Sequence, residues 1–167
     1  MYSSLATFLH AWKNESEATQ RILDALTDSS LEQKISASDR TLGRIAWHIV
    51  TTVPEMMSRT GLTFESIDEE MSVPTSAKAI ADYYREVSNN MVTAIKEQWD
   101  DETLLEEREM YGEHWTIGST LNSLICHQIH HRGQLTVLMR QAGLKVPGIY
   151  GPSREEWSQY GMEAPLV

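Results

Sequence analysis

The residues with the greatest capacity for chemistry are two histidines four positions apart, His127 and His131. On an α-helix this spacing places both side chains on the same face, one turn apart. Neutral imidazole is a good ligand for zinc, nickel, copper and iron, so the two rings can converge on one cation. His130 lies between them in the sequence but points to another side of the helix. The spacing therefore indicates half of a metal site.

Two ligands seldom hold a metal ion, so a third has to come from another helix. His48 is the candidate, because it lies beside Ile45 and Ile49 on the apolar, inward stripe of a second predicted helix. A buried imidazole nitrogen without a partner costs on the order of 1–3 kcal/mol. One metal ion would satisfy His48, His127 and His131 together, and we predict these three residues as metal ligands. The alternative is a core histidine at position 48, hydrogen-bonded to a backbone or side-chain acceptor, and a chance pair on the other helix.

Three protein ligands leave coordination positions for water or substrate, which is typical of a catalytic rather than a closed structural site. A bound cation can lower the pKa of a coordinated thiol or water and so generate a nucleophile near neutral pH. The pair also resembles the zinc-protease signature His-Glu-x-x-His, but Gln128 stands where that signature has Glu. An amide cannot accept the proton that this mechanism transfers. The sequence thus excludes a protease of that type.

No residue can be assigned as the catalytic base from the sequence. Glu55, two turns beyond the predicted ligand of the second helix, and Tyr111 or Glu113 in the segment before the last helix are candidates. Arg132 and Gln134 could orient ligands from outside the metal site. The alternative for both is a surface or interface contact.

The remaining reactive and aromatic side chains are expected to pack. Neighbours on a helix diverge by about 100 degrees, so Cys126 is expected to be a small buried filler rather than a nucleophile paired with His127. Trp47, Trp99, Trp115 and Trp157 are expected to be packing groups, and Trp115 or Tyr150 could wall a substrate pocket near the last helix.

Four segments with helical periodicity must position these side chains. They cover residues 4–26, 41–61, 74–100 and 116–143, and a polar stretch at residues 14–20 interrupts the apolar pattern of the first. Four helices without sheet-forming material predict an all-α fold. We expect a four-helix bundle, mainly antiparallel, as one domain over residues 1–167, with a short C-terminal helix around residues 153–160.

Local signals refine these elements. Asp39 or Thr41 can cap the second helix, and Thr116 can cap the fourth, which Gly143 should end. Pro54 lies within the second helical pattern and should kink it or mark an irregularity. Residues 62–73 form an acidic connection, and residues 104–115 could be a loop or a small hairpin.

Composition excludes several classes of partner. The chain of 167 residues has 24 acidic and 14 basic side chains and a formal net charge of −10, which disfavours nucleic acid as a partner. A lone cysteine permits no intramolecular disulfide and suits a reducing compartment. The N-terminus lacks the features of a signal peptide, and no apolar run approaches the roughly 20 residues that a membrane span needs. We therefore expect a cytoplasmic protein that does not enter a membrane.

The sequence resembles the DinB-like family of damage-inducible proteins along nearly its whole length. The resemblance is carried by residues 42–48 (LGRIAWH), residues 127–135 (HQIHHRGQL), Gly143 and Pro147. It implies a four-helix bundle, frequently a homodimer, with a three-histidine site for zinc or nickel. His48, His127 and His131 occupy the ligand positions of that pattern, and His130 does not. Some relatives transfer or isomerise substrates with the help of a low-molecular-weight thiol.

Three functions are compatible with these features. The first is a divalent-metal-dependent enzyme acting on a small molecule, either a thiol-dependent S-transferase or a hydrolase-like catalyst. The second is a non-catalytic metal- or ligand-binding protein of stress response, in which no substrate pocket adjoins the metal. The third is a structural bundle whose histidines hydrogen-bond within the core. Apolar residues on the outward faces of the first and third helices are consistent with a homodimer.

Overall fold

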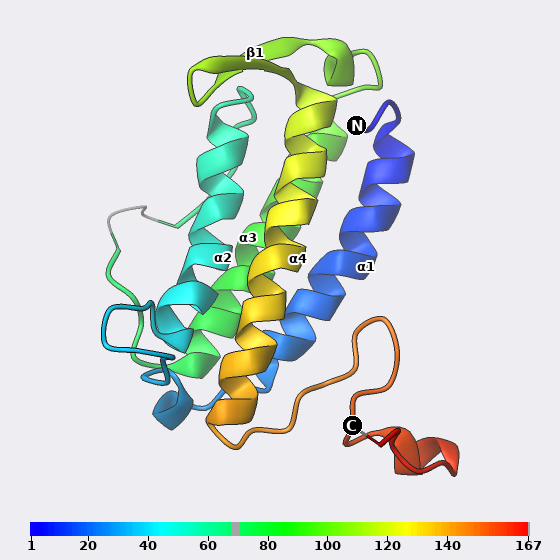
Figure 1. Ribbon diagram of the computed structural model, residues 1–167. Helices are drawn as coiled ribbons and strands as arrows, with labels where there is room; N and C mark the ends of the chain where they lie inside the picture. Colours follow the sequence, from blue (N-terminus) through cyan, green and yellow to red (C-terminus); the bar gives the residue numbers. More distant parts are fainter. Residues whose placement is uncertain (68–70, 167) are drawn as a thin grey trace.

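The computed structural model describes residues 1–67 and 71–166, and four long helices dominate it (Figure 1). The helices are α1 (Leu5–Asp24), α2 (Leu42–Ser58), α3 (Ala77–Gln98) and α4 (Ile117–Gln141). They form the four-helix bundle that the periodicity predicts. Within the described ranges, no helix combines the length and the apolar character needed to cross a bilayer.

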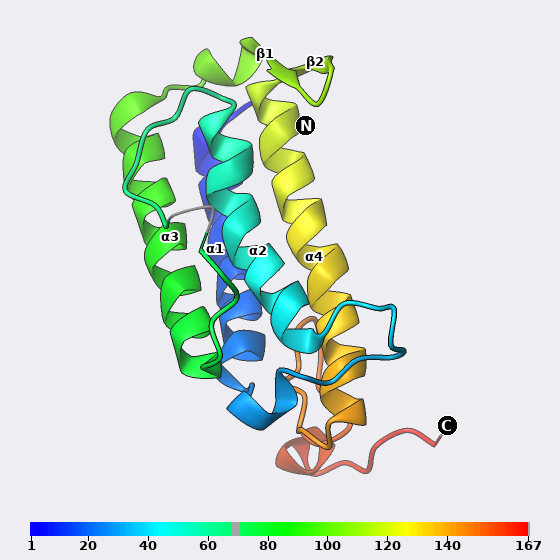
Figure 2. The same ribbon diagram turned by 90° about the vertical axis from the view of Figure 1, so that its left-hand side faces the viewer.

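The order of the helices in space determines which of them can share a site. Helices α1 and α4 begin at the end of the bundle that carries the short hairpin, whereas α2 and α3 run toward that end (Figures 1 and 2). The neighbouring pairs α2–α4 and α1–α3 are therefore antiparallel, while α2–α3 and α1–α4 are parallel. The connection that follows α2 runs back along the length of the bundle, so α3 begins at the same end as α2. Residues 68–70 of the predicted acidic connection lie outside the described residues.

Side-chain caps set the start of three helices. The hydroxyl oxygens of Thr41, Ser76 and Thr116 accept hydrogen bonds from the backbone amides of Arg44, Ala79 and Ser119, respectively. Such caps satisfy amides that have no partner within the helix. Thr41 rather than Asp39 is thus the cap of α2. Pro54 lies within α2, which nevertheless continues to Ser58.

The segment between α3 and α4 forms a small hairpin, which is one of the two predicted alternatives. Strands β1 (Glu107–Met110) and β2 (Glu113–Thr116) pair antiparallel. Tyr111 and Gly112 make the turn, with φ values of 57° and 87°. Two-residue turns of this kind require positive φ at both positions. Glycine accepts that conformation readily, whereas tyrosine adopts it at an energetic cost.

Three short 3₁₀ turns complete the secondary structure of the described residues: Asp28–Ser30, Thr103–Leu105 and Trp157–Tyr160. The last replaces the C-terminal helix predicted around residues 153–160, so that prediction was too long. Residues 153–156 instead form a turn in which the Glu156 carboxylate accepts hydrogen bonds from the amides of Gly148 and Ser153. Side-chain hydrogen bonds of this kind give the backbone amides partners outside a helix, and so compete with a longer helix.

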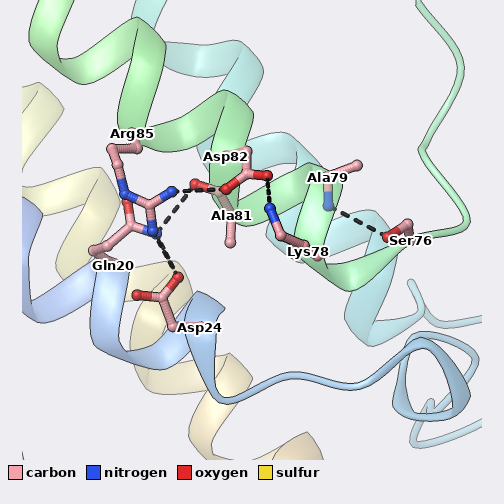
Figure 3. A network of polar contacts seen from close by, with 8 residues as sticks. All are labelled: Gln20, Asp24, Ser76, Lys78, Ala79, Ala81, Asp82 and Arg85. Carbon is pink, nitrogen blue, oxygen red and sulfur yellow. Dashed lines mark hydrogen bonds and ion pairs between the residues drawn. The ribbon is translucent and has the colours of Figure 1, made fainter.

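The core contains aromatic and aliphatic side chains from all four helices, among them Phe8, Trp12, Trp47 and Met91. Helix α1 is continuous through its polar stretch. Toward its C-terminal end, polar contacts join it to α3: Gln20 donates to the carbonyl oxygen of Ala81 at 3.1 Å, and Arg85 pairs with Asp24 at 3.0 Å (Figure 3). Such exposed ion pairs contribute little individually, so burial of the apolar faces remains the main stabilising term.

Candidate metal centre

The three predicted ligands meet between α2 and α4. His48 lies on α2, while His127 and His131 lie one turn apart on α4, and all three are half-buried. One ligand atom from each lies within 4.8 Å of the others. Nε2 of His48 is 3.1 Å from Nε2 of His127. The structure therefore brings together the residues that the sequence singled out from two distant segments.

A buried glutamine joins the two helices beside this cluster. Gln128, which is 1% exposed, donates its side-chain amide to the carbonyl oxygen of Ile49 at 3.1 Å. Gln128 follows His127 in the sequence, and Ile49 follows His48. The hydrogen bond thus holds the ligand-bearing turns of α2 and α4 at a fixed height relative to one another.

Hydrogen bonds to the far side of two rings select which nitrogen faces the cluster. Thr52 donates its hydroxyl to the carbonyl oxygen of His48 at 2.7 Å, so its oxygen can accept a hydrogen bond from Nδ1 of His48 at 3.4 Å. Gln134 places its amide oxygen 2.7 Å from Nδ1 of His131. A protonated Nδ1 leaves Nε2 with a lone pair, which is the form that coordinates a metal.

The third ring carries an unsatisfied atom. Nδ1 of His127 is buried and has no hydrogen-bond partner among the described residues.

The spacing of the facing nitrogens suits a metal ion. Two ligands of a tetrahedral zinc ion, with bonds of about 2.0–2.1 Å, lie roughly 3.3 Å apart, close to the 3.1 Å between Nε2 of His127 and Nε2 of His48. A hydrogen bond between these two rings fits the same distance, but it does not explain why the ring of His131 lies in the same cluster. The donor set therefore fits a divalent cation.

The electrostatics of the cluster favour neutral imidazoles. Burial, together with a smaller contribution from the charge of His131, lowers the pKa of His48 to about 4. Burial likewise lowers the pKa of His127 to about 4, again with a contribution from His131. Burial also lowers the pKa of His131. Only the neutral ring offers a lone pair to a metal, so the rings are in the coordinating state at neutral pH.

A hollow of about 410 Å³ opens beside His48 and His127, toward the hairpin. Glu55 and Tyr111 line it, together with Trp115. The Tyr111 hydroxyl donates to Oε2 of Glu55 at 2.8 Å, and Nε of Arg59 donates to Oε1 at 2.8 Å. Burial raises the pKa of Tyr111 to about 12, and the hydrogen bond to Glu55 acts in the same direction. Two of the three predicted base candidates thus lie in this hollow, and Trp115 forms part of its wall.

A second hollow of about 380 Å³ lies on the other side of the cluster, beside His131. Its walls include the apolar side chains of Ile45 and Leu138, and the loop before α2 contributes Arg40. The sequence offered no direct signal for Arg40, because this loop carries neither an apolar pattern nor a motif. Thr52 was also missed as a partner of His48, although its position one turn later on α2 is the available signal.

Several side chains considered from the sequence lie elsewhere. Arg132 is not a surface residue, since its side chain is only 3% exposed and pairs with Glu15 at 2.6 Å. Tyr150 bonds to the same Glu15 at 2.8 Å and lines neither hollow beside the histidines. Glu113 accepts from Nε1 of Trp115 at 2.8 Å and also lies outside both hollows.

Two further expectations concern α4. Cys126 is exposed rather than buried. The prediction of a buried filler was therefore wrong. His130 is exposed and lies outside the metal-ligand group, as its position between the ligands predicts. Gln134 does contact His131, a predicted ligand, which favours the orienting role over a simple surface contact.

Comparison with known proteins agrees with this fold. The uncharacterized protein YrdA of Bacillus subtilis is 53% identical over 167 residues, which is the full length of both chains. A crystal structure of a DinB-like protein from Bacillus cereus is 50% identical and superimposes with a TM-score of 0.86, covering 90% of this chain and 100% of that one.

A more distant structure shares the fold alone. The DinB-like protein YjoA of Bacillus subtilis is 17% identical, with a TM-score of 0.68 over 86% of this chain and 97% of that one. The model of the DinB family matches residues 1–163. The chain thus belongs to the DinB family.

Proposed function

We propose that this protein binds one divalent metal ion, zinc or nickel, through His48, His127 and His131, and that it transfers a low-molecular-weight thiol to a small electrophile. The observation that carries the proposal is the position of the three imidazoles between two hollows. His48 and His127 line one hollow, and His131 lines the other. A purely structural site has no need of such space.

When bound, the cation would supply positive charge that stabilises a thiolate near neutral pH. Glu55 is the one carboxylate lining the hollow beside His48 and His127 among the described residues. It is positioned to accept the thiol proton, and the Tyr111 hydroxyl and Arg59 hold it in place. The sulfur then forms a bond to the electrophilic carbon, and the leaving group departs with the electron pair of the broken bond.

The remaining functional predictions accompany this proposal. The protein is proposed to act on small molecules, to form a homodimer and to function in the cytoplasm without nucleic acid or membrane partners. The alternative function is a non-catalytic metal- or ligand-binding protein of stress response. The volume of the two hollows favours the transferase, because metal storage alone requires no pocket next to the ligands.

The test is a transferase assay with untagged protein, stripped of metal and reloaded with zinc or nickel. A panel of small thiols is combined with 1-chloro-2,4-dinitrobenzene, and thioether formation is measured. The proposal predicts activity that appears on reloading and falls at least tenfold in Glu55→Gln, with unchanged metal content. Glu113→Gln, a matched change in the hairpin, should keep full activity. Stoichiometric metal without any thiol transfer would support the alternative function instead.

A further inference from the structure

The hollow beside His131 differs in chemistry from the one beside His48 and His127. Ile45, Val137 and Leu138 give it apolar walls, and Ile35 of the preceding loop adds to them. Val137 is 52% exposed and Ile35 is 68% exposed. Apolar side chains left exposed around a concavity favour a ligand that removes them from water. The volume of about 380 Å³ is near the lower end of the range for small-molecule sites, so the ligand must be small.

One cationic side chain, Arg40, completes this hollow. Within the part of the chain that the structure describes, its guanidinium takes part in no ion pair or hydrogen bond. Asp39 also lines the hollow, but its Oδ2 accepts a hydrogen bond from the Ser36 hydroxyl at 2.7 Å, within the loop. That bond leaves the negative charge of Asp39 in place, but among the described residues no ion pair joins Asp39 to Arg40, so the guanidinium remains available to an anion. A planar guanidinium can bind a carboxylate through two parallel hydrogen bonds.

We propose that the hollow beside His131 binds a small amphipathic carboxylate, with the carboxylate on Arg40, the apolar body against Ile45, Val137 and Leu138, and the other end toward His131. This ligand is the electrophilic acceptor, an assignment that rests on the proposed function. The thiol then occupies the opposite hollow, where Glu55 lies. His48 and His127 line the thiol hollow and His131 lines the acceptor hollow, so both substrates border the same histidine cluster.

The structure offers a matched control for the charge. Arg44 is an exposed arginine at the start of α2, four positions after Arg40, and it does not line the hollow. Replacing either residue with Met removes one positive charge from the same region. Only the change at Arg40 removes a group from the proposed site, so the pair separates direct contact from long-range attraction.

The experiment measures hexanoate binding by titration calorimetry, with hexanol and hexylamine as uncharged and cationic probes of similar length and hexyl phosphate as a second anion. The full chain is used in both metal-free and metal-loaded forms. The proposal predicts that hexanoate binds more tightly than the other three probes. It also predicts that Arg40→Met weakens hexanoate binding about tenfold to a hundredfold in both forms. Arg44→Met should change it less than twofold, and Val137→Asn should weaken hexanoate and hexanol alike.

Several results would overturn the inference. Equal losses in Arg40→Met and Arg44→Met would mean that attraction is non-specific. Binding that requires metal and ignores Arg40 would place the carboxylate on the cation instead, and tighter binding of hexyl phosphate would identify the anion as a phosphate. The outcome is distinct from that of the transferase assay. Thiol transfer without hexanoate binding removes this inference alone. Arg40-dependent binding without transfer removes the proposed function, and with it the ligand's role as acceptor, but leaves the carboxylate site.

Discussion

The side-chain amide of Gln134 lies between two histidines of α4. Its oxygen is 2.7 Å from Nδ1 of His131, and its nitrogen is 3.2 Å from Nε2 of His130. The two contacts fix the orientation of the amide, because the oxygen must accept and the nitrogen must donate. Gln134 therefore holds His131 with its Nε2 directed toward the cluster, as partners of metal-binding histidines usually do.

Replacement of Gln134 by Met should weaken metal binding without unfolding the bundle. The Met side chain has a similar length but lacks the amide oxygen that accepts a hydrogen bond from Nδ1 of His131. The ring therefore loses its preferred tautomer and orientation. We expect the affinity for zinc to fall about tenfold to a hundredfold. Competition with a chromophoric chelator measures this affinity. Gln141→Met, at the end of the same helix, is the control, and an equal loss in both variants would argue against the orienting role.

The buried pair of Arg132 and Glu15 should matter for stability and not for metal binding. Arg132 also donates to the hydroxyl of Thr19 at 3.1 Å, and it lies outside the histidine cluster. Arg132→Met leaves the Glu15 carboxylate largely buried without its cation, which should lower the free energy of unfolding by about 3 kcal/mol. Urea denaturation measures the loss. Arg140→Met, which breaks a more exposed pair, should cost under about 1 kcal/mol.

The acid sensitivity of the C-terminal segment should depend on Glu155. Hydrogen bonds from Arg140 lower the pKa of the Glu155 carboxyl to about 2, against an ordinary value of 4.5. A depressed pKa in the folded state means that the pair contributes stability above pH 4.5 and loses it as the pH falls toward 2. Glu155→Gln should therefore lower the melting temperature at pH 7, and the difference from the natural chain should shrink at pH 3. A difference that persists unchanged at pH 3 would contradict this account.

The elements of the bundle were predictable because their signals are local. Thr116 and Gly143 mark the ends of α4 by capping and by positive φ, and both act over a few neighbouring residues. The turn at Tyr111 was less predictable, since tyrosine is atypical at positive φ. Its hydroxyl bonds to Glu55, 56 positions away, and its ring lies 4.6 Å from the Arg59 guanidinium. Contacts formed only in the folded chain thus accompany a conformation that the local sequence does not favour.

The burial of Arg132 was not predictable for the same reason. Its partner Glu15 lies 117 positions away, in the polar stretch of α1 that carries no apolar pattern. The histidine cluster was predictable because two of its members share one helix face and the third lies in an apolar stripe. The two hollows beside it were not, because they depend on how the loop before α2 and the hairpin close over α4.

The most direct measurement is the metal content of two variants that differ by one position. His131→Ala removes a proposed ligand, while His130→Ala removes its neighbour on the same helix, whose ring is exposed and outside the cluster. Untagged proteins are loaded with zinc, passed through a desalting column and analysed for metal per chain. The account predicts close to one zinc ion per chain in the natural protein and in His130→Ala, and almost none in His131→Ala. Full occupancy in His131→Ala, or loss of zinc in His130→Ala alone, would contradict the three-histidine site.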